Sequence, residues 1–302
     1  MGKPKQSDNL KLPSYGGQAL IEGVLMRSSK YVAAAMRAPS GEIVVQTEEL
    51  KGIYTTKLAK LPFLRGLVIL WDSLGLGTRY LGISANLQTG ENEKIEGPAM
   101  AISMLVSFAF AIALFFLAPA GLAQLFEKWL NLTPFIGNLI EGVIRLIFVI
   151  GYIWGVGKLP DIRRVFSYHG AEHKTINAFE DSAVLSCSSI KPYSLYHPRC
   201  GTGFVVILVV FSVILFTLIG PLPNIWIRLL TRIVLIPILV MIAYEYMRFS
   251  AINIKHPVFR FLSVINMGMQ RLTTVEPTDE MLEVSLTAFE TMYKLEMGKV
   301  DG

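Results

Sequence analysis

The chain has 302 residues, of which 52% are hydrophobic and only 17% are charged, and its mean hydropathy is +0.49. A soluble protein of this length needs more charge to cover its surface, so the composition predicts an integral membrane protein. The net charge of +5 comes from Lys and Arg residues that flank apolar runs without forming a basic stripe. This pattern predicts membrane lipids as partners and argues against nucleic acid.

The N-terminal segment is polar at first and then rich in glycine. Residues 1–14 lack the apolar core and small-residue cleavage site of a signal peptide, so we expect a frayed cytoplasmic arm. In the stretch that follows, Gly16 and Gly17 allow another backbone or a ligand to approach closely, while Gln18 and Glu22 supply polar groups. The spacing is not that of a phosphate-binding loop. A binding segment and a structural turn are both open interpretations.

Two further elements are predicted before the first long apolar run. Residues 31–38 and 42–49 are β-prone and are separated by a Pro-Ser-Gly turn, a pattern typical of a β-hairpin. Residues 61–87 are moderately apolar and carry three charges at seven-residue spacing, at Arg65, Asp72 and Arg79. Because that spacing puts the charges on one helical face, we expect an interfacial amphipathic helix or a partly inserted hairpin.

Four apolar runs are long enough to cross about 30 Å of hydrocarbon as helices. They are predicted near residues 99–118, 135–157, 203–222 and 229–247. The first is expected to end at Pro119. In the second, Glu141 and Arg145 are four residues apart, so they are expected to pair with each other or to face the interior of the bundle.

The distribution of Lys and Arg predicts the orientation of these spans. The two loops predicted on the far side contain only Lys128 and Arg228, whereas the other segments are rich in both residue types. We therefore expect a multi-pass protein of the cell membrane with both termini in the cytoplasm. The predicted organisation is a cytoplasmic N-terminal segment, a first pair of spans, a cytoplasmic loop, a second pair of spans and a C-terminal helical region, at residues 1–95, 96–157, 158–201, 202–248 and 249–302.

The C-terminal region contains a second predicted element. Thr278 is followed by two acidic residues and then by apolar residues at helical spacing up to Gly298, which predicts a capped amphipathic helix. The predicted fold class is thus an α-helical integral membrane protein of about four transmembrane helices. Its small cytoplasmic portion is of the α+β type and includes the β-hairpin.

The most specific chemical signal is an H-x-x-E-H motif in the 158–201 loop. His169 and His173 lie one helical turn apart, which lets two imidazoles hold one divalent metal, most simply zinc, while Glu172 stays free to act as a general base. Glu180 lies on the same face and is a candidate third ligand, with His197 as the other. Histidines that cap helices or bind carbonyl groups are the competing interpretation.

Two cysteines complete the set of candidate residues. Cys187 and Cys200 are expected to be free thiols or metal ligands, because a cytoplasmic segment does not keep disulfides. Cys200 is followed by Gly-Thr-Gly, so a tight entry into the third span is the favoured interpretation, with metal ligation as the alternative.

Four motifs in the same order resemble the YqhQ-like family of bacterial membrane proteins. They are YGGQALIEGVLMR at 15–27, YHGAEHKTINAFE at 168–180, HPRCGTGF at 197–204 and QRLTTVEP at 270–277. That family is a domain-of-unknown-function family described as predicted metal-dependent enzymes. The resemblance implies that a set of polar residues and glycines belongs to the family signature, without assigning a role to each: His169, Glu172, His173, His197 and Cys200, together with Gly16, Gly17, Gln18 and Glu22. Glu180 also fits the family pattern.

The leading hypothesis is a membrane-embedded metal-dependent hydrolase that acts on a peptide or lipid-like substrate at a cytoplasm-facing site. The alternative is a non-enzymatic membrane factor that binds a partner protein, or a second copy of the chain, or that assists membrane-protein assembly. A third hypothesis, an ion or small-solute conduit, rests on the ionisable residues within the spans.

Overall fold

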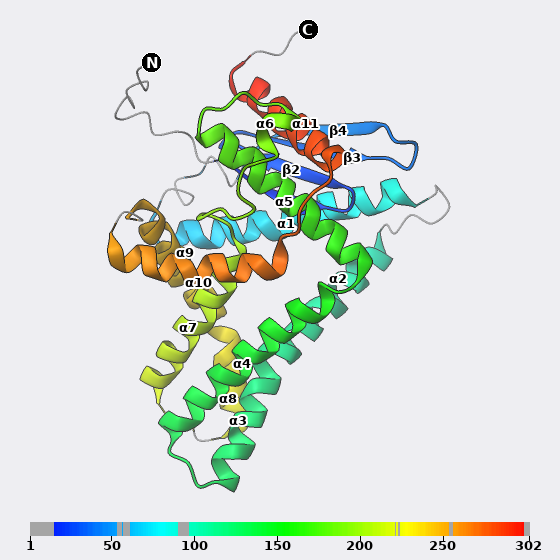
Figure 1. Cartoon of the computed structure of the whole chain (residues 1–302). Helices are drawn as coiled ribbons and strands as arrows, with labels where there is room; N and C mark the ends of the chain where they lie inside the picture. The colour runs from blue at the N-terminus through cyan, green and yellow to red at the C-terminus, as the bar shows by residue number, and fades with distance from the viewer. Residues whose placement is uncertain are drawn as a thin grey trace.

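The computed structural model describes residues 15–52, 56, 61–89, 97–220, 222, 224–253 and 256–298. Figure 1 shows two parts, a small sheet with helices packed on it at one end and a group of long helices at the other. The expected N-terminal arm at 1–14 lies outside the described residues.

The sheet has four antiparallel strands in chain order, β1 (Gly16–Leu20), β2 (Gly23–Arg27), β3 (Tyr31–Arg37) and β4 (Ile43–Glu49). The predicted hairpin is confirmed as β3 and β4. The glycine-rich segment is also a hairpin, which the sequence interpretation as a turn or binding segment did not include. Leu20 pairs with Gly23, so Ile21 and Glu22 form a two-residue turn in which Glu22 takes a positive φ of 52°.

Both faces of the sheet are covered, as the alternation of side chains along a strand allows. Val24 and Met26 of β2 face a core built with α5 (Pro160–Glu180) and α11 (Asp279–Glu296). Leu25 of β2 faces the other way, toward α1 (Leu64–Gln88). The sheet together with α1, α5 and α11 is called the sheet domain below. The short α6 (Cys187–Ile190) packs beside α5 and α11.

The predicted C-terminal helix is confirmed. The Thr278 hydroxyl accepts a hydrogen bond from the Met281 N–H at 3.4 Å, which satisfies one of the free donors at the start of α11. Phe289 is fully buried where α11 crosses the sheet.

Residues 61–87 contain one helix, α1, rather than a hairpin. Its three charged residues make ion pairs instead of facing solvent together: Arg65 with Glu245, Asp72 with Arg27, and Arg79 with Glu48. The Arg65 Nε to Glu245 Oε1 distance is 2.6 Å. These pairs tie α1 to the sheet on one side and to the apolar helices on the other.

The helical bundle contains α2 (Pro98–Ile112), a π-helical turn η4 (Ala113–Leu117), α3 (Ala118–Trp129), α4 (Pro134–Val156), α7 (Thr202–Ile219), α8 (Ile225–Val234) and α9 (Ile236–Ile252). In the described part of the chain, three helices are long and apolar enough to cross a membrane: Ala101–Trp129, Pro134–Val156 and Thr202–Ile219. The pair α8 and α9, bent by 44°, makes a fourth if it is counted as one span. Finally, α10 (Pro257–Thr273) packs along α7 and leads back toward the sheet domain.

The expected end of the first span at Pro119 is wrong, because the helix continues to Trp129. Proline has no N–H to bond the carbonyl four residues earlier, which here belongs to Phe115. The π-helical turn η4 absorbs the irregularity, and the Phe115 carbonyl instead accepts a hydrogen bond from Arg145 Nε at 2.9 Å. A side chain from α4 thus allows the helix to pass through its proline.

Candidate metal centre

A cavity of about 360 Å³ lies between β1, α5 and the segment that leads into α7. His169, Glu172 and His173 line it from α5, and Gly16, Gly17 and Gln18 line it from β1. His197 and Cys200 come from the third side. Thr273 at the end of α10 also lines the cavity. The structure therefore brings together four separate segments of the chain: β1, α5, the segment before α7 and the end of α10.

The two histidines of the motif are oriented by backbone carbonyl groups. His169 Nδ1 lies 2.9 Å from the Thr273 carbonyl oxygen, and His173 Nδ1 lies 2.5 Å from that of Leu195. Because a carbonyl only accepts, each Nδ1 carries the proton and each Nε2 has a lone pair to offer. This is the arrangement by which metal-binding histidines are usually held.

Cys200 provides a third donor at the same place. Its Sγ is 3.3 Å from His169 Nε2, and the candidate ligand atoms of His169, His173 and Cys200 all lie within 4.8 Å of one another. Both cysteines of the chain are free thiols. Two imidazoles and a thiolate form a donor set that suits zinc.

Glu172 is buried beside this trio. One carboxylate oxygen receives a hydrogen bond from the Gly17 N–H, while Oε2 is buried without a hydrogen-bond partner among the described residues. Burial raises the pKa of Glu172 to about 7, although His169 and the Gly17 N–H act in the opposite direction. A carboxyl group of this kind can gain or lose a proton near neutral pH.

Gly17 makes the position of Glu172 possible. A Cβ added at Gly17 would lie 2.6 Å from the Leu25 carbonyl oxygen and 2.9 Å from Glu172 Cδ, whereas a Cβ at Gly16 would meet nothing within 4 Å. The close approach that the glycine-rich segment was expected to allow therefore occurs at Gly17, where the Leu25 carbonyl and the Glu172 side chain come near the backbone. Gln18 packs its amide group against Gly77 of α1.

Glu180 and His197, the two expected third ligands, lie outside the trio. Glu180 forms an ion pair with Arg199, and its Oε1 is 3.3 Å from His197 Nε2. Two helical turns, about 10 Å, separate Glu180 from His173 along α5, so sharing a face does not bring the two to one ion. The backbone of His197 is held by Gln270, with both hydrogen bonds at 2.8 Å.

Glu22 has a different surrounding from the one expected. Its carboxylate accepts hydrogen bonds from Arg164 Nε at 2.5 Å and Nη2 at 2.6 Å, and from the Tyr168 hydroxyl at 3.2 Å. The hydrogen bond from Arg164 holds the pKa of Glu22 below its usual value. Glu22 thus fixes the β1–β2 turn to α5 and does not line the cavity.

Comparison with known proteins identifies the family of this chain. The family model described as "Protein of unknown function (DUF1385)" matches residues 61–295. The chain belongs to this family. It is similar to a protein of Bacillus subtilis (strain 168) named "Uncharacterized protein YqhQ", with 33% identity over 301 residues that cover 94% of this chain and 93% of the relative. This confirms the resemblance drawn from the four motifs. No solved structure matches the chain.

Proposed function

We propose that this protein is a membrane-embedded metal-dependent hydrolase. The observation that carries the proposal is the convergence of the His169, His173 and Cys200 donor atoms within 4.8 Å of one another, in a cavity that also contains the buried Glu172. Structural zinc sites are usually closed by four protein ligands, whereas catalytic sites use three and keep one position open.

The residues present fit a zinc ion. The Nδ1 hydrogen bonds of both histidines leave each Nε2 available, and the thiol of Cys200 lies beside them. When bound, a zinc ion would supply Lewis acidity that activates water and polarises a carbonyl or phosphoryl group. Glu180 and His197 would support the site from outside, through Arg199 and Gln270.

Glu172 is the proposed general base. The Gly17 N–H fixes one of its oxygens, which leaves Oε2 to take a proton from an attacking water and to return it to the leaving group. Its burial keeps the carboxyl group in a setting of low polarity, where proton transfer at neutral pH is favourable. The lack of a side chain at Gly17 is necessary for this placement.

The location of the cavity supports a substrate at the membrane surface. Cys200 and Thr202 stand at the start of α7, one of the helices long and apolar enough to span a membrane. The three Lys- and Arg-rich segments, 1–95, 158–201 and 249–302, contribute the elements of the sheet domain, which supports placing all three in the cytoplasm. We therefore propose a peptide or lipid-like substrate near the inner leaflet.

Cobalt substitution tests the ligand set directly. Co²⁺ bound to a thiolate gives a sulfur-to-metal charge-transfer absorption, so the purified full-length chain loaded with Co²⁺ should show that band. Cys200→Ser should lose it, whereas Cys187→Ser, the matched control at the other thiol, should keep it. A band that is absent from the wild type, or that is lost in Cys187→Ser, would contradict the site and favour a partner-binding membrane factor.

A further inference from the structure

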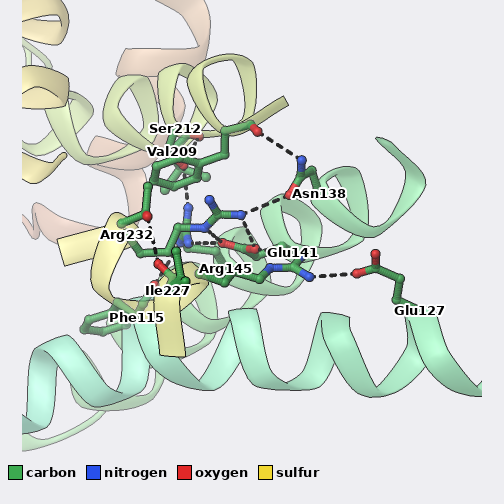
Figure 2. Close-up of polar contacts among 12 residues, drawn as sticks. Phe115, Glu127, Asn138, Glu141, Arg145, Val209, Ser212, Ile227 and Arg232 are labelled. Carbon is green, nitrogen blue, oxygen red and sulfur yellow. Dashed lines mark hydrogen bonds and ion pairs between the residues drawn. The ribbon is translucent and has the colours of Figure 1, made fainter. Parts of the chain in front are cut away.

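A largely buried network of charges connects helices that lie away from the sheet domain in Figure 1, and Figure 2 shows its polar contacts. It joins α3, α4 and α8 and plays no part in the proposed hydrolase site. Its members are Glu127, Glu141, Arg145, Arg228 and Arg232.

Glu141 is the centre of this network, and it is fully buried. Its carboxylate accepts hydrogen bonds from Arg145 Nη2 at 2.7 Å, from Arg232 Nε and Nη2 at 2.8 Å each, and from Arg228 Nη2 at 3.2 Å (Figure 2). Glu127 pairs with Arg228 at 2.7 Å. Three guanidinium groups thus share two carboxylates, which leaves an excess of one positive charge in a region of low polarity.

Two arginines of the network have donors that are not used. Arg232 is 1% exposed, and its Nη1 has no hydrogen-bond partner among the described residues. The Nε of Arg228 is also buried and has no hydrogen-bond partner among the described residues. The Phe216 ring lies 3.8 Å from the Arg232 guanidinium carbon and covers one face of that group. A buried donor without an acceptor is costly, so these groups favour an additional acceptor.

A polar cavity of about 140 Å³ adjoins these arginines. Arg228 and Arg232 of α8 line it together with Gln124 and the exposed Lys128 of α3. Asn138 of α4 also lines it, and its amide already bonds the Phe216 carbonyl and Arg232. A single water needs roughly 10–15 Å³ of such volume, so the cavity has room for several waters or for one tetrahedral oxyanion. Glu127 also lines it, but its carboxylate is already paired with Arg228.

We propose that this cavity binds a phosphate group. Cationic donors make strong hydrogen bonds to phosphate oxygens, and lysine, arginine and glutamine side chains that converge from α3 and α8 suit a tetrahedral ligand better than a planar carboxylate. Asn138 lies about one turn into α4, within a few ångström of the helix start, which is the depth of lipid headgroups if the helix spans a membrane. The phosphate belongs either to a free anion or to an anionic lipid, and both present the same chemistry to the site.

Binding measurements on the purified full-length chain in a neutral detergent test this proposal. Isothermal titration with inorganic phosphate forms one arm, and titration with dioctanoyl phosphatidylglycerol forms the other, with dioctanoylglycerol as the ligand that lacks phosphate. At least one phosphate-bearing ligand should bind saturably, and dioctanoylglycerol should not. Binding of inorganic phosphate assigns the site to a free anion, and binding of the lipid alone assigns it to a headgroup.

Two variants locate the binding site. Lys128→Glu reverses a charge at the exposed rim without touching the buried pairs, so it should fold and weaken binding about tenfold. Lys158→Glu, the same change beyond the other end of α4, should leave binding unchanged. Arg228→Gln should weaken binding as well, with its thermal midpoint recorded to verify folding. Absence of saturable binding in both arms, or equal weakening by Lys128→Glu and Lys158→Glu, would overturn the proposal.

Discussion

Replacing Gly17 by Ala should destabilise the protein through one new methyl group. That methyl would lie 2.6 Å from the Leu25 carbonyl oxygen and 2.9 Å from Glu172 Cδ, both closer than ordinary van der Waals contact. The carbonyl belongs to β2, which is paired on both sides and has little freedom to move. Overpacking of this kind costs about 1–3 kcal/mol, which for a domain of this size lowers the thermal midpoint by roughly 2–10 °C.

Gly16→Ala is the matched control, because it sits in the same strand and its methyl would meet nothing within 4 Å. Its effect on the free energy of unfolding should stay within about 0.5 kcal/mol. Thermal unfolding of both variants in detergent, followed by intrinsic fluorescence, measures the difference. Gly17→Ala should also keep its metal, since Glu172 is not a ligand. Equal midpoints for the two variants would refute the argument that Gly17 holds Glu172 against β1.

Three further predictions concern other parts of the structure. Phe289→Ala removes a fully buried ring between α11 and the sheet and should lower the free energy of unfolding by about 3–5 kcal/mol, measured by chemical denaturation. Glu141→Gln leaves buried arginines without their shared carboxylate and should lower the free energy of unfolding by about 3–5 kcal/mol. Glu127→Gln, at the edge of the network, should lower it by about 1 kcal/mol or less, and a similar loss for both variants would contradict the central place of Glu141. Because Arg164 lowers the native-state pKa of Glu22, this ion pair stabilises the fold at pH 7. Its contribution declines as the pH falls below the usual carboxyl pKa and is lost once the pH passes the lowered native-state pKa. In urea unfolding, the wild type should exceed Glu22→Gln by about 0.2–1 kcal/mol at pH 7 and by progressively less as the pH is lowered below the usual carboxyl pKa.

Local patterns predicted the elements whose stability is encoded locally. The β3–β4 hairpin follows from alternating β-prone residues around a Pro-Ser-Gly turn, and α11 from the cap at Thr278. The β1–β2 hairpin was missed because Gly16 and Gly17 have low strand propensity, which pairing with β2 overrides. The continuation of the first apolar helix past Pro119 depends on Arg145 of another helix. No window of sequence around the proline contains that information.

Some features of the candidate site also follow from local sequence, and others depend on the fold. Spacing alone puts His169 and His173 on one face of a helix, since both lie within α5. The approach of Cys200 is set by the fold, because the segment between α5 and α7 brings its Sγ to within 3.3 Å of His169 Nε2. The helical rise between His173 and Glu180 can also be read from their spacing, whereas the pairing of Glu180 with Arg199, 19 residues away, depends on the fold. The imidazoles are oriented by the backbone carbonyls of Thr273 and Leu195, and because every residue has such a carbonyl, the sequence does not indicate these partners.

The metal content of the purified chain tests the central claim most directly. Protein prepared without chelators and in the presence of zinc should contain about one zinc per chain by elemental analysis. His173→Ala should lose the metal, and Glu172→Gln should retain it, because a general base is not a ligand. Wild-type protein without stoichiometric metal, or a His173→Ala variant with as much metal as the wild type, would contradict the account.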